Sequence, residues 1–206
     1  MDMNWRPPLH IIASIIVVTL IAATLFDGAL VKCPVISPPT AANINYYITH
    51  TGINAVSGTD LNAFSQPQSF SYLSYEQLTT LSSDLILHAK ISFVLEIIAG
   101  FLIQFTIIGA LAQSTISVRM IQIMAFIAVM STIIAAVFDS LLVSDAGKIE
   151  PSDLASFNLM SVNATAQTTL GTCTIAKAGI FAWIAAGLWL MIFLDGWRSM
   201  RKQTQK

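Results

Sequence analysis

The sequence is poor in charged side chains. Asp, Glu, Lys and Arg together make up 10% of the chain, whereas hydrophobic residues make up 55%. A soluble domain carries about 25% charged residues, so this composition indicates an integral membrane protein. The formal net charge is -1, and the chain has no basic run or base-stacking motif, which argues against a nucleic-acid partner.

The sequence also lacks the motifs of common enzymes. It has no glycine-rich phosphate loop, no metalloprotease histidine pair and no nucleophile elbow. Its three histidines, His10, His50 and His88, are widely separated. Glu96 and Asp139 could mimic a catalytic pair of carboxylates, but no partner residues accompany them. We therefore predict a protein that is not an enzyme and that needs no cofactor.

Long hydrophobic runs, in contrast, are abundant. A bilayer core of about 30 Å is spanned by ~20 apolar residues in a helix. The runs predict transmembrane helices at residues 11–31, 88–113, 120–143 and 175–196, with long outer loops at 32–87 and 144–174. The first run also fits a signal peptide, because Arg6 precedes it, but we interpret it as a spanning helix. The expected fold is all-α: one membrane domain (1–206), a four-transmembrane-helix bundle with a small cap made by the two loops.

Lysine and arginine are denser on one side of this bundle than on the other. Arg6 lies in the head, Arg119 in the short loop between the second and third helices, and four cations lie in the tail at 198–206. Cytoplasmic segments carry such an excess, so both termini are expected to be cytoplasmic and both long loops extracellular. The one N-glycosylation sequon starts at Asn163 and then lies outside, which makes Asn163 a candidate glycosylation site.

Only two cysteines are present, and both lie just beyond the outer ends of predicted helices. Cys33 follows the first helix and Cys173 precedes the fourth. If these helices are neighbours, a disulfide can join the two loops in the oxidising exterior. The alternative is two unpaired cysteines. No histidine lies near them in the sequence, so they do not indicate a zinc site.

The second helix carries a polar stripe. Ser92, Glu96, Gly100 and Gln104 recur at every fourth position, which places them on one face. Polar groups on one face avoid lipid, so this face is expected to point into the bundle.

Acidic residues also occur near the outer ends of the first and third helices. We predict that these acids and one serine form an intramembrane polar cluster: Asp27, Ser92, Glu96 and Asp139. One interpretation is a cation or proton site that faces the outer leaflet. The other is a structural hydrogen-bonded cluster that also includes Ser140 and either His88 or a lysine.

The fourth helix carries a stripe of small residues. Ala178, Ala182 and Ala186 recur at every fourth position, and such stripes let helices pack closely. We predict that this stripe is a helix-packing face and that it forms an interaction face together with the outer loops.

Three short stretches resemble a known family. They are Leu85-Ile86-Leu87-His88 before the second helix, Ala135-Ala136-Val137-Phe138-Asp139 in the third, and Thr169-Leu170-Gly171 before the fourth. With the four-helix plan, they resemble the fungal SUR7/PalI group of claudin-like tetraspan membrane proteins. The claudin loop signature, Gly-Leu-Trp followed by a cysteine pair, is absent, so Cys33 has no partner within the first loop.

The resemblance implies a plasma-membrane protein of the cell cortex, although an endomembrane location stays open. The expected function is a non-enzymatic accessory or scaffold subunit, surrounded by membrane lipids, that organises a membrane domain or associates with other copies. A larger integral membrane protein, such as a channel, a receptor or a cell-wall polymer synthase, is the other expected partner. The alternative is an oligomeric channel or transporter that uses the acidic cluster.

Overall fold

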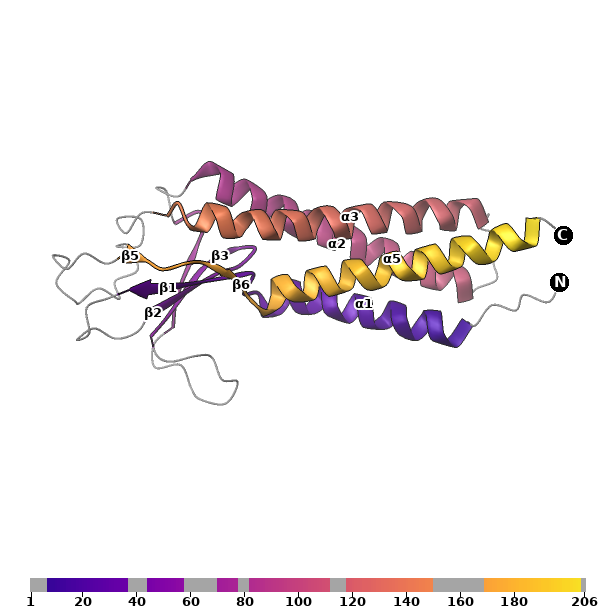
Figure 1. The fold of residues 1–206 in the computed structure, drawn as a ribbon, viewed down its shortest axis with the longest axis horizontal. Coiled ribbons are helices and arrows are strands. Elements are labelled where there is room, and N and C mark those ends of the chain that lie inside the picture. Colours follow the sequence, from indigo (N-terminus) through magenta and orange to yellow (C-terminus); the bar gives the residue numbers. More distant parts are fainter. Residues whose placement is uncertain are drawn as a thin grey trace.

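The computed structural model describes residues 7–36, 44–57, 70–77, 82–111, 118–149 and 169–204. Within these residues, long helices lie lengthwise beside one another and a small sheet lies at one end (Figure 1). The helices are α1 (Pro7–Asp27), α2 (Ser83–Leu111), α3 (Val118–Ala146) and α5 (Lys177–Thr204). We call the sheet and its turns the cap.

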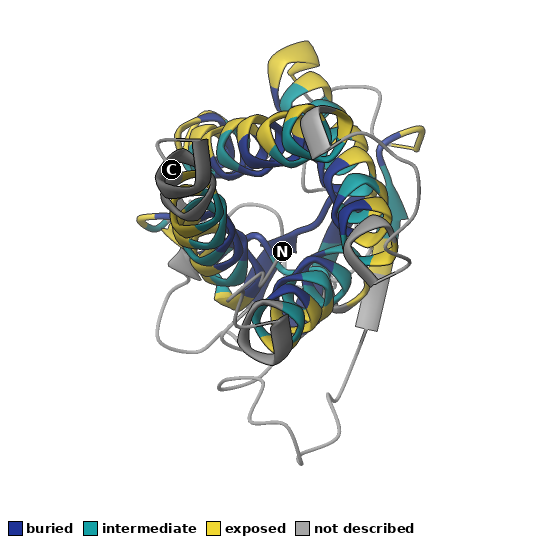
Figure 2. Ribbon diagram, turned by 90° about the vertical axis from the view of Figure 1, so that its right-hand side faces the viewer, coloured by how far each residue is buried: buried dark blue, intermediate teal, exposed yellow. Residues whose placement is uncertain are grey.

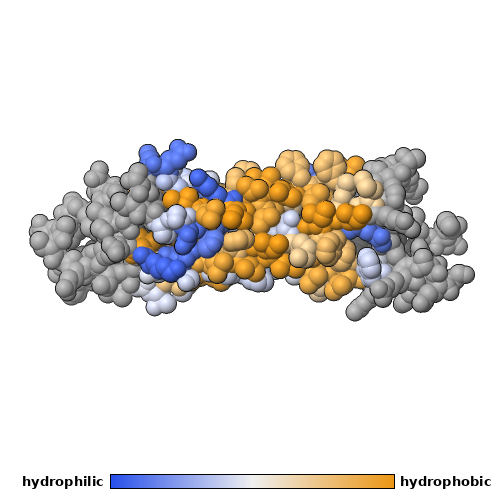
Figure 3. All heavy atoms as spheres, turned by 90° about the horizontal axis from the view of Figure 1, so that it is seen from above, coloured by the Kyte–Doolittle hydropathy of each residue, from blue (hydrophilic) through white to orange (hydrophobic). Residues whose placement is uncertain are grey.

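The outer surface of the helices is apolar. Three of them contain stretches that are long and apolar enough to cross a membrane: Ser83–Ile108, Met120–Ala146 and Lys177–Trp197. Helix α1 contributes a shorter apolar stretch, Ile11–Phe26. Hydrophobic side chains cover the middle of the molecule, and hydrophilic ones gather toward the cap (Figure 3). Contiguous apolar surface of this extent identifies an integral membrane protein.

The helices form a closed ring when viewed along the bundle (Figure 2). Helix α1 packs against α2, α2 against α3, α3 against α5, and α5 against α1. The buried side of each helix faces its neighbours, and the exposed side faces outward (Figure 2). Sequence neighbours α2 and α3 therefore form an antiparallel hairpin, as the very short loop between them predicts.

The cap is an antiparallel sheet, so the all-α prediction is wrong for this part of the chain. Its strand order is β4-β3-β2-β1-β5, and β6 also pairs with β1. The strands are β1 (Val31–Ile36), β2 (Ile44–Ile48), β3 (Gly52–Ser57), β4 (Phe70–Ser74), β5 (Thr169–Leu170) and β6 (Thr174–Ile175). Strand β2 includes Asn45–Ile48, where the alternation of polar and apolar residues indicates a short strand. Strands β5 and β6 have two residues each, too few to show a period, and β1 contains Pro34.

The cap begins directly at the end of the first helix. Gly28 has a φ of 56°, a left-handed conformation that suits glycine and ends α1 at Asp27. The predicted first span to residue 31 is therefore too long by one turn, because Leu30 already donates its backbone N–H to the Ile48 carbonyl at 2.8 Å. The second helix differs in the opposite sense, since α2 begins at Ser83 rather than at residue 88.

The buried core has two apolar parts. The first joins the cap to the helix ends nearest it and includes Leu30, Ile48, Ile53, Leu85 and Leu142. The second lies inside the ring of helices, further from the cap, and includes Val17, Ile21, Ile103, Val129 and Trp189. We call them the cap core and the bundle core. Between them, the sequence places polar side chains rather than apolar ones.

Candidate functional site

Polar side chains from four elements meet at the level between the two cores. All are nearly inaccessible, with 0 to 3% of their surface exposed. They are Thr24 of α1, His50 of the β2–β3 turn, Ser92 and Glu96 of α2, and Asp139 of α3. We call these five residues the polar layer.

Each carboxyl group of the polar layer accepts a hydrogen bond from a hydroxyl group on a neighbouring helix. The Thr24 hydroxyl donates to Glu96 Oε2 at 2.5 Å. The Ser92 hydroxyl donates to Asp139 Oδ1, also at 2.5 Å. These bonds link α1 to α2 and α2 to α3, so the layer fixes the relative positions of three helices. Hydrogen bonds between helices are one of the main specific contacts available inside a membrane.

His50 reaches the bundle from the cap. Hydrogen bonds within the cap fix the hairpin turn that carries it. The Thr49 N–H donates to the Gly52 carbonyl at 2.9 Å, and the Gly52 N–H donates to Thr49 Oγ1 at 3.1 Å. The Tyr75 hydroxyl donates to the Thr49 carbonyl at 2.6 Å. These bonds hold the turn over the bundle, with the His50 side chain buried among the helices.

His50 lies between the two carboxyl groups without bonding to either. Its Nε2 atom is 3.8 Å from Glu96 Oε2 and 3.8 Å from Asp139 Oδ1, beyond hydrogen-bond distance. Burial lowers the pKa of His50 to about 4, and a contact with the Thr24 backbone opposes this shift. At neutral pH the imidazole is therefore uncharged and offers a lone pair on one nitrogen.

Several atoms of the layer have no partner. Within the part of the chain that the structure describes, Glu96 Oε1, Asp139 Oδ2 and His50 Nδ1 are buried and make no hydrogen bond. Buried polar atoms without partners are costly, and buried charges are normally paired or bound to metal. Two carboxyl groups and one imidazole can hold either a proton or a cation. The Ser92 hydroxyl lies beside them, with Oγ 3.4 Å from His50 Nε2.

The structure brings together most of the predicted polar cluster. Ser92, Glu96 and Asp139 are adjacent and buried, as the predicted inward face of the second helix requires. The side chain of Asp27 lies outside the described residues. The prediction is wrong for Gln104, which is exposed. Four residues advance a helix by about 40° more than one turn, so three such steps rotate the stripe by about 120°, away from the bundle interior.

Two further residues proposed for a structural cluster lie elsewhere, so that part of the prediction is also wrong. His88 Nδ1 is 2.6 Å from Asp145 Oδ2, in a separate ion pair that Lys148 also joins. Ser140 accepts a hydrogen bond from Trp183 Nε1 at 2.9 Å. His88 lies one turn of α2 from Ser92, nearer the cap, and Ser140 lies about 100° around α3 from Asp139.

Sequence reasoning missed Thr24 and His50. Thr24 is one of three hydroxyl residues in the apolar helix α1, with Ser14 and Thr19, and their spacing of five residues does not place them on one face. His50 follows strand β2, and the dipeptide Thr51-Gly52 is typical of a turn, so the sequence indicates a turn here. It does not indicate the direction of the turn, because the position of a hairpin tip relative to the helices depends on contacts far apart in the sequence.

The alanine stripe of α5 packs inside this chain's own bundle. Ala178, Ala182 and Ala186 are 3%, 5% and 2% exposed. The stripe is thus buried against neighbouring helices, and the prediction that it offers an interaction face to a partner is wrong. The short side chains instead let α5 approach α1 and α3 closely.

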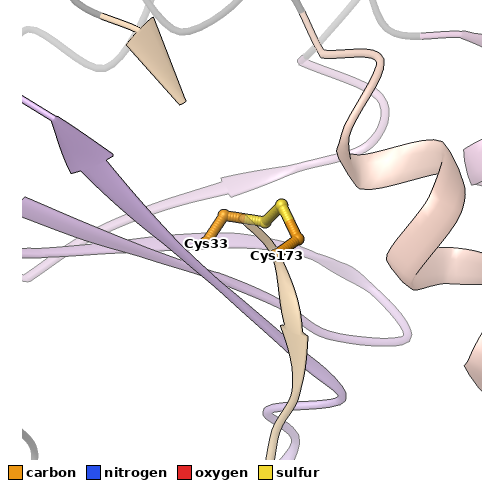
Figure 4. Close-up of a disulfide and its surroundings, with 2 residues drawn as sticks. All are labelled: Cys33 and Cys173. Atoms are coloured by element: carbon orange, nitrogen blue, oxygen red, sulfur yellow. A yellow bond between two sulfur atoms is a disulfide. The ribbon is translucent and has the colours of Figure 1, made fainter. Parts of the chain in front are cut away.

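The predicted disulfide is confirmed. Cys33 of β1 and Cys173, between β5 and β6, are joined with a Cα–Cα distance of 4.2 Å (Figure 4). The bond ties the two predicted loops into one sheet, and β1 pairs with both β5 and β6 on either side of it. The candidate glycosylation site Asn163 lies outside the described residues.

Removing the hydroxyl group of Tyr75 should loosen the turn that carries His50. We expect Tyr75→Phe to lower the free energy of unfolding by about 1–2 kcal/mol, because the buried Thr49 carbonyl loses its 2.6 Å hydrogen bond. Thermal melting of the purified protein in detergent, followed by tryptophan fluorescence, measures this change. Tyr72→Phe is the matched control: Tyr72 bonds Thr51 of the same turn but is exposed, so its loss should be nearly neutral.

The same variant should change the response to alkaline pH. Burial raises the pKa of Tyr75 above its usual value of 10.0, and the neighbouring Tyr72 adds to the shift. Because the folded-state pKa is the higher one, Tyr75 stabilises the fold below pH 10, and this contribution is lost as the pH rises above it. Wild-type melting temperature should fall more steeply above pH 10 than that of Tyr75→Phe. Parallel pH profiles would show that Tyr75 is not buried as described.

No model of a known protein family matches the chain, and no curated protein matches it. The function therefore has to be argued from the geometry of the bundle, the cap and the polar layer.

Proposed function

We propose that the chain is a four-span, claudin-like accessory or scaffold protein of the plasma membrane. In this proposal both termini are cytoplasmic, the cap is extracellular, and the protein acts by associating with a larger membrane protein or with further copies of itself. Helix α1 has 21 residues, about 31 Å of helix, which suffices for a fourth span.

The proposed orientation is supported by the chemistry of the two ends. The disulfide between Cys33 and Cys173 lies in the cap, and disulfides persist in oxidising compartments. The cations Arg6 and Arg119 and those of the tail belong to segments at the opposite ends of the helices. An extracellular cap satisfies both the redox rule and the positive-inside rule.

The observation that carries the proposal is the filled interior of the bundle. Beyond the polar layer, away from the cap, Val17, Ile103 and Trp189 are buried in the bundle core at 0 to 3% exposure. Among the described residues, the buried titratable side chains all lie at the polar layer or nearer the cap: Tyr46, Tyr47, His50, Tyr75, Glu96, Asp139 and Asp145. A proton or ion path needs polar groups along its length. The buried polar side chains described beyond the layer are hydroxyls that do not ionise, Ser14, Thr106, Ser131 and Thr132, and those of Thr106 and Thr132 donate to carbonyls of their own helices. A single bundle packed in this way supports a binding role rather than conduction.

A channel or transporter remains the second candidate, because Glu96 Oε1 and Asp139 Oδ2 are buried without partners. Such a protein would release a trapped ion or pH gradient from proteoliposomes. Flux by the wild-type chain that Glu96→Gln or Asp139→Asn abolishes would favour this candidate over the scaffold. Absence of flux from folded, reconstituted protein would remove it.

The scaffold function can be tested by site-specific photocrosslinking in the native membrane. A photoreactive residue is placed at one outward-facing position on each helix: Ile15, Phe101, Ile127 or Ile184. A protein that binds a partner through one face should give one crosslinked product from one or two adjacent helices. Buried Ala182 is the matched negative position. The proposal would be contradicted for the helix faces if no helix position gave a crosslink to a protein and the chain had a monomeric mass in mild detergent. The same reaction at the exposed residue Tyr72 would then test whether the cap binds the partner.

A further inference from the structure

Three ligand-type atoms converge in the polar layer from three separate elements. His50 comes from the cap hairpin, Glu96 from α2 and Asp139 from α3, and one ligand atom of each lies within 4.8 Å of the other two. All three side chains are at most 3% exposed. Within the described part of the chain, His50 Nδ1, Glu96 Oε1 and Asp139 Oδ2 make no hydrogen bond, whereas His50 Nε2 lies 3.4 Å from the Ser92 hydroxyl.

We propose that His50, Glu96 and Asp139 bind one divalent cation of the zinc class. An imidazole nitrogen and two carboxylate oxygens are ligands that Zn²⁺ accepts in proteins. Two ionised carboxylates, a neutral imidazole and a dication sum to zero charge, which resolves the burial of acidic groups inside the bundle. The proposal goes beyond the accessory function and does not depend on it.

The distances suit an ion placed between the side chains. Zinc lies 2.0–2.2 Å from nitrogen and oxygen ligands, and tetrahedral angles then separate two ligands by about 3.4 Å. His50 Nε2 is 3.8 Å from Glu96 Oε2 and from Asp139 Oδ1. These two separations need to close by a few tenths of an ångström, and the two carboxylate ligand atoms, which lie within 4.8 Å of each other, by up to about 1.4 Å, which rotation of the side chains can supply.

The hydroxyl groups of the layer act as outer-shell supports for these ligands. Thr24 donates to the Glu96 oxygen nearest His50, and Ser92 donates to the corresponding oxygen of Asp139. Metal-binding carboxylates are commonly oriented by such hydrogen bonds. The unpaired Glu96 Oε1 and Asp139 Oδ2 give each carboxylate a second oxygen with which to contact the ion.

The donor set favours zinc-like ions over calcium or magnesium. Ca²⁺ takes 6–8 oxygen ligands, and Mg²⁺ requires octahedral oxygen coordination with several waters. A buried site with one imidazole and two carboxylates offers fewer ligands and includes nitrogen, which first-row transition metals and zinc prefer. A bound ion would connect the cap turn directly to α2 and α3, and so would fix the cap on the bundle.

Metal binding can be measured on the purified full chain in detergent. The protein is first stripped with EDTA and then titrated with Zn²⁺, and melting temperature and bound metal are both recorded. We expect one tightly bound Zn²⁺ per chain and a saturable rise in melting temperature of about 5 °C or more, reversed by EDTA. Co²⁺ in place of Zn²⁺ should give the visible absorption of a low-coordinate site. Calcium and magnesium should produce neither effect.

The variants assign the metal to these residues. Glu96→Gln and Asp139→Asn keep side-chain size and remove a charged ligand, so each should weaken Zn²⁺ binding at least tenfold while the protein stays folded. His88→Gln is the matched control, because His88 forms a separate, partly buried pair with Asp145, so this change should leave binding unchanged. The proposal is overturned if wild-type protein binds no Zn²⁺ or Co²⁺, if it prefers Ca²⁺, or if Glu96→Gln and Asp139→Asn bind Zn²⁺ like wild type.

Discussion

Replacing both Cys33 and Cys173 with serine is expected to lower the free energy of unfolding of the cap by about 3 kcal/mol. The disulfide joins residues 140 positions apart, and cross-linking so long a loop removes much of the disorder of the unfolded chain. A free loop of about 100 residues would give about 4.7 kcal/mol. The expected value is smaller because this loop contains α2 and α3, which the membrane holds even when the cap is unfolded.

Melting of the double variant and of wild type with reductant should agree, because both remove the same bond. Thr172→Ser, next to Cys173 but exposed, is the control and should melt like wild type. Before reduction, a thiol-reactive polymer should not shift the protein on a gel, since the two cysteines are joined. A shift of the unreduced native protein would show that the bond is absent and would remove the basis of this prediction.

The sequence predicts the helices well because the residues of each helix show which side faces lipid and which side faces the bundle interior. A run of apolar residues has to face lipid, and Ser92 and Glu96 avoid lipid by facing inward, where the structure places them. The same local rule also finds Asp139. It fails for Gln104 because a spacing of four residues drifts around the helix, so only the first members of the stripe share the buried face.

The sheet is harder to predict because its strands are defined by their partners. Strand β1 contains Pro34, and β5 and β6 have two residues each, too few to show alternation. They form strands because the disulfide and the pairing of Val35 with Leu170 place them beside β1. This pairing joins segments more than 130 residues apart, so no local sequence pattern predicts it.

The polar layer falls between these two cases. Its two acids follow from the cost of a carboxyl group in lipid, and their neighbour Ser92 follows from the helical period. His50 depends on the register of β2 with β3, which sets the residue at the tip of the hairpin. Four residues of the polar layer therefore lie on helices, and the fifth, His50, comes from the cap. The position of the hairpin decides whether the site is complete.

Replacing Gly52 with alanine should disrupt this hairpin more than other small changes in the cap. A β-carbon at Gly52 would lie 2.3 Å from the Leu73 carbonyl oxygen and 3.0 Å from the Ser74 Cα, so backbone atoms would have to move. Gly52 pairs with Ser74 in the sheet, and forcing β3 from β4 also displaces Tyr75, which holds the Thr49 carbonyl. We expect a loss of about 3 kcal/mol in the free energy of unfolding.

Gly187→Ala provides the control for the Gly52 variant. Gly187 lies on the exposed side of α5, and a β-carbon there meets no atom within 4 Å, so this change should not destabilise the protein. Hydrogen exchange of the β2–β3 amides, together with melting, separates the two variants. In Gly52→Ala exchange should increase at Thr49 and at Ile53 but not in the bundle core, because the close contact involves only β3 and β4. Equal melting of Gly52→Ala and wild type would mean that β3 and β4 do not pair in this register, and His50 would then have no fixed place above the two acids.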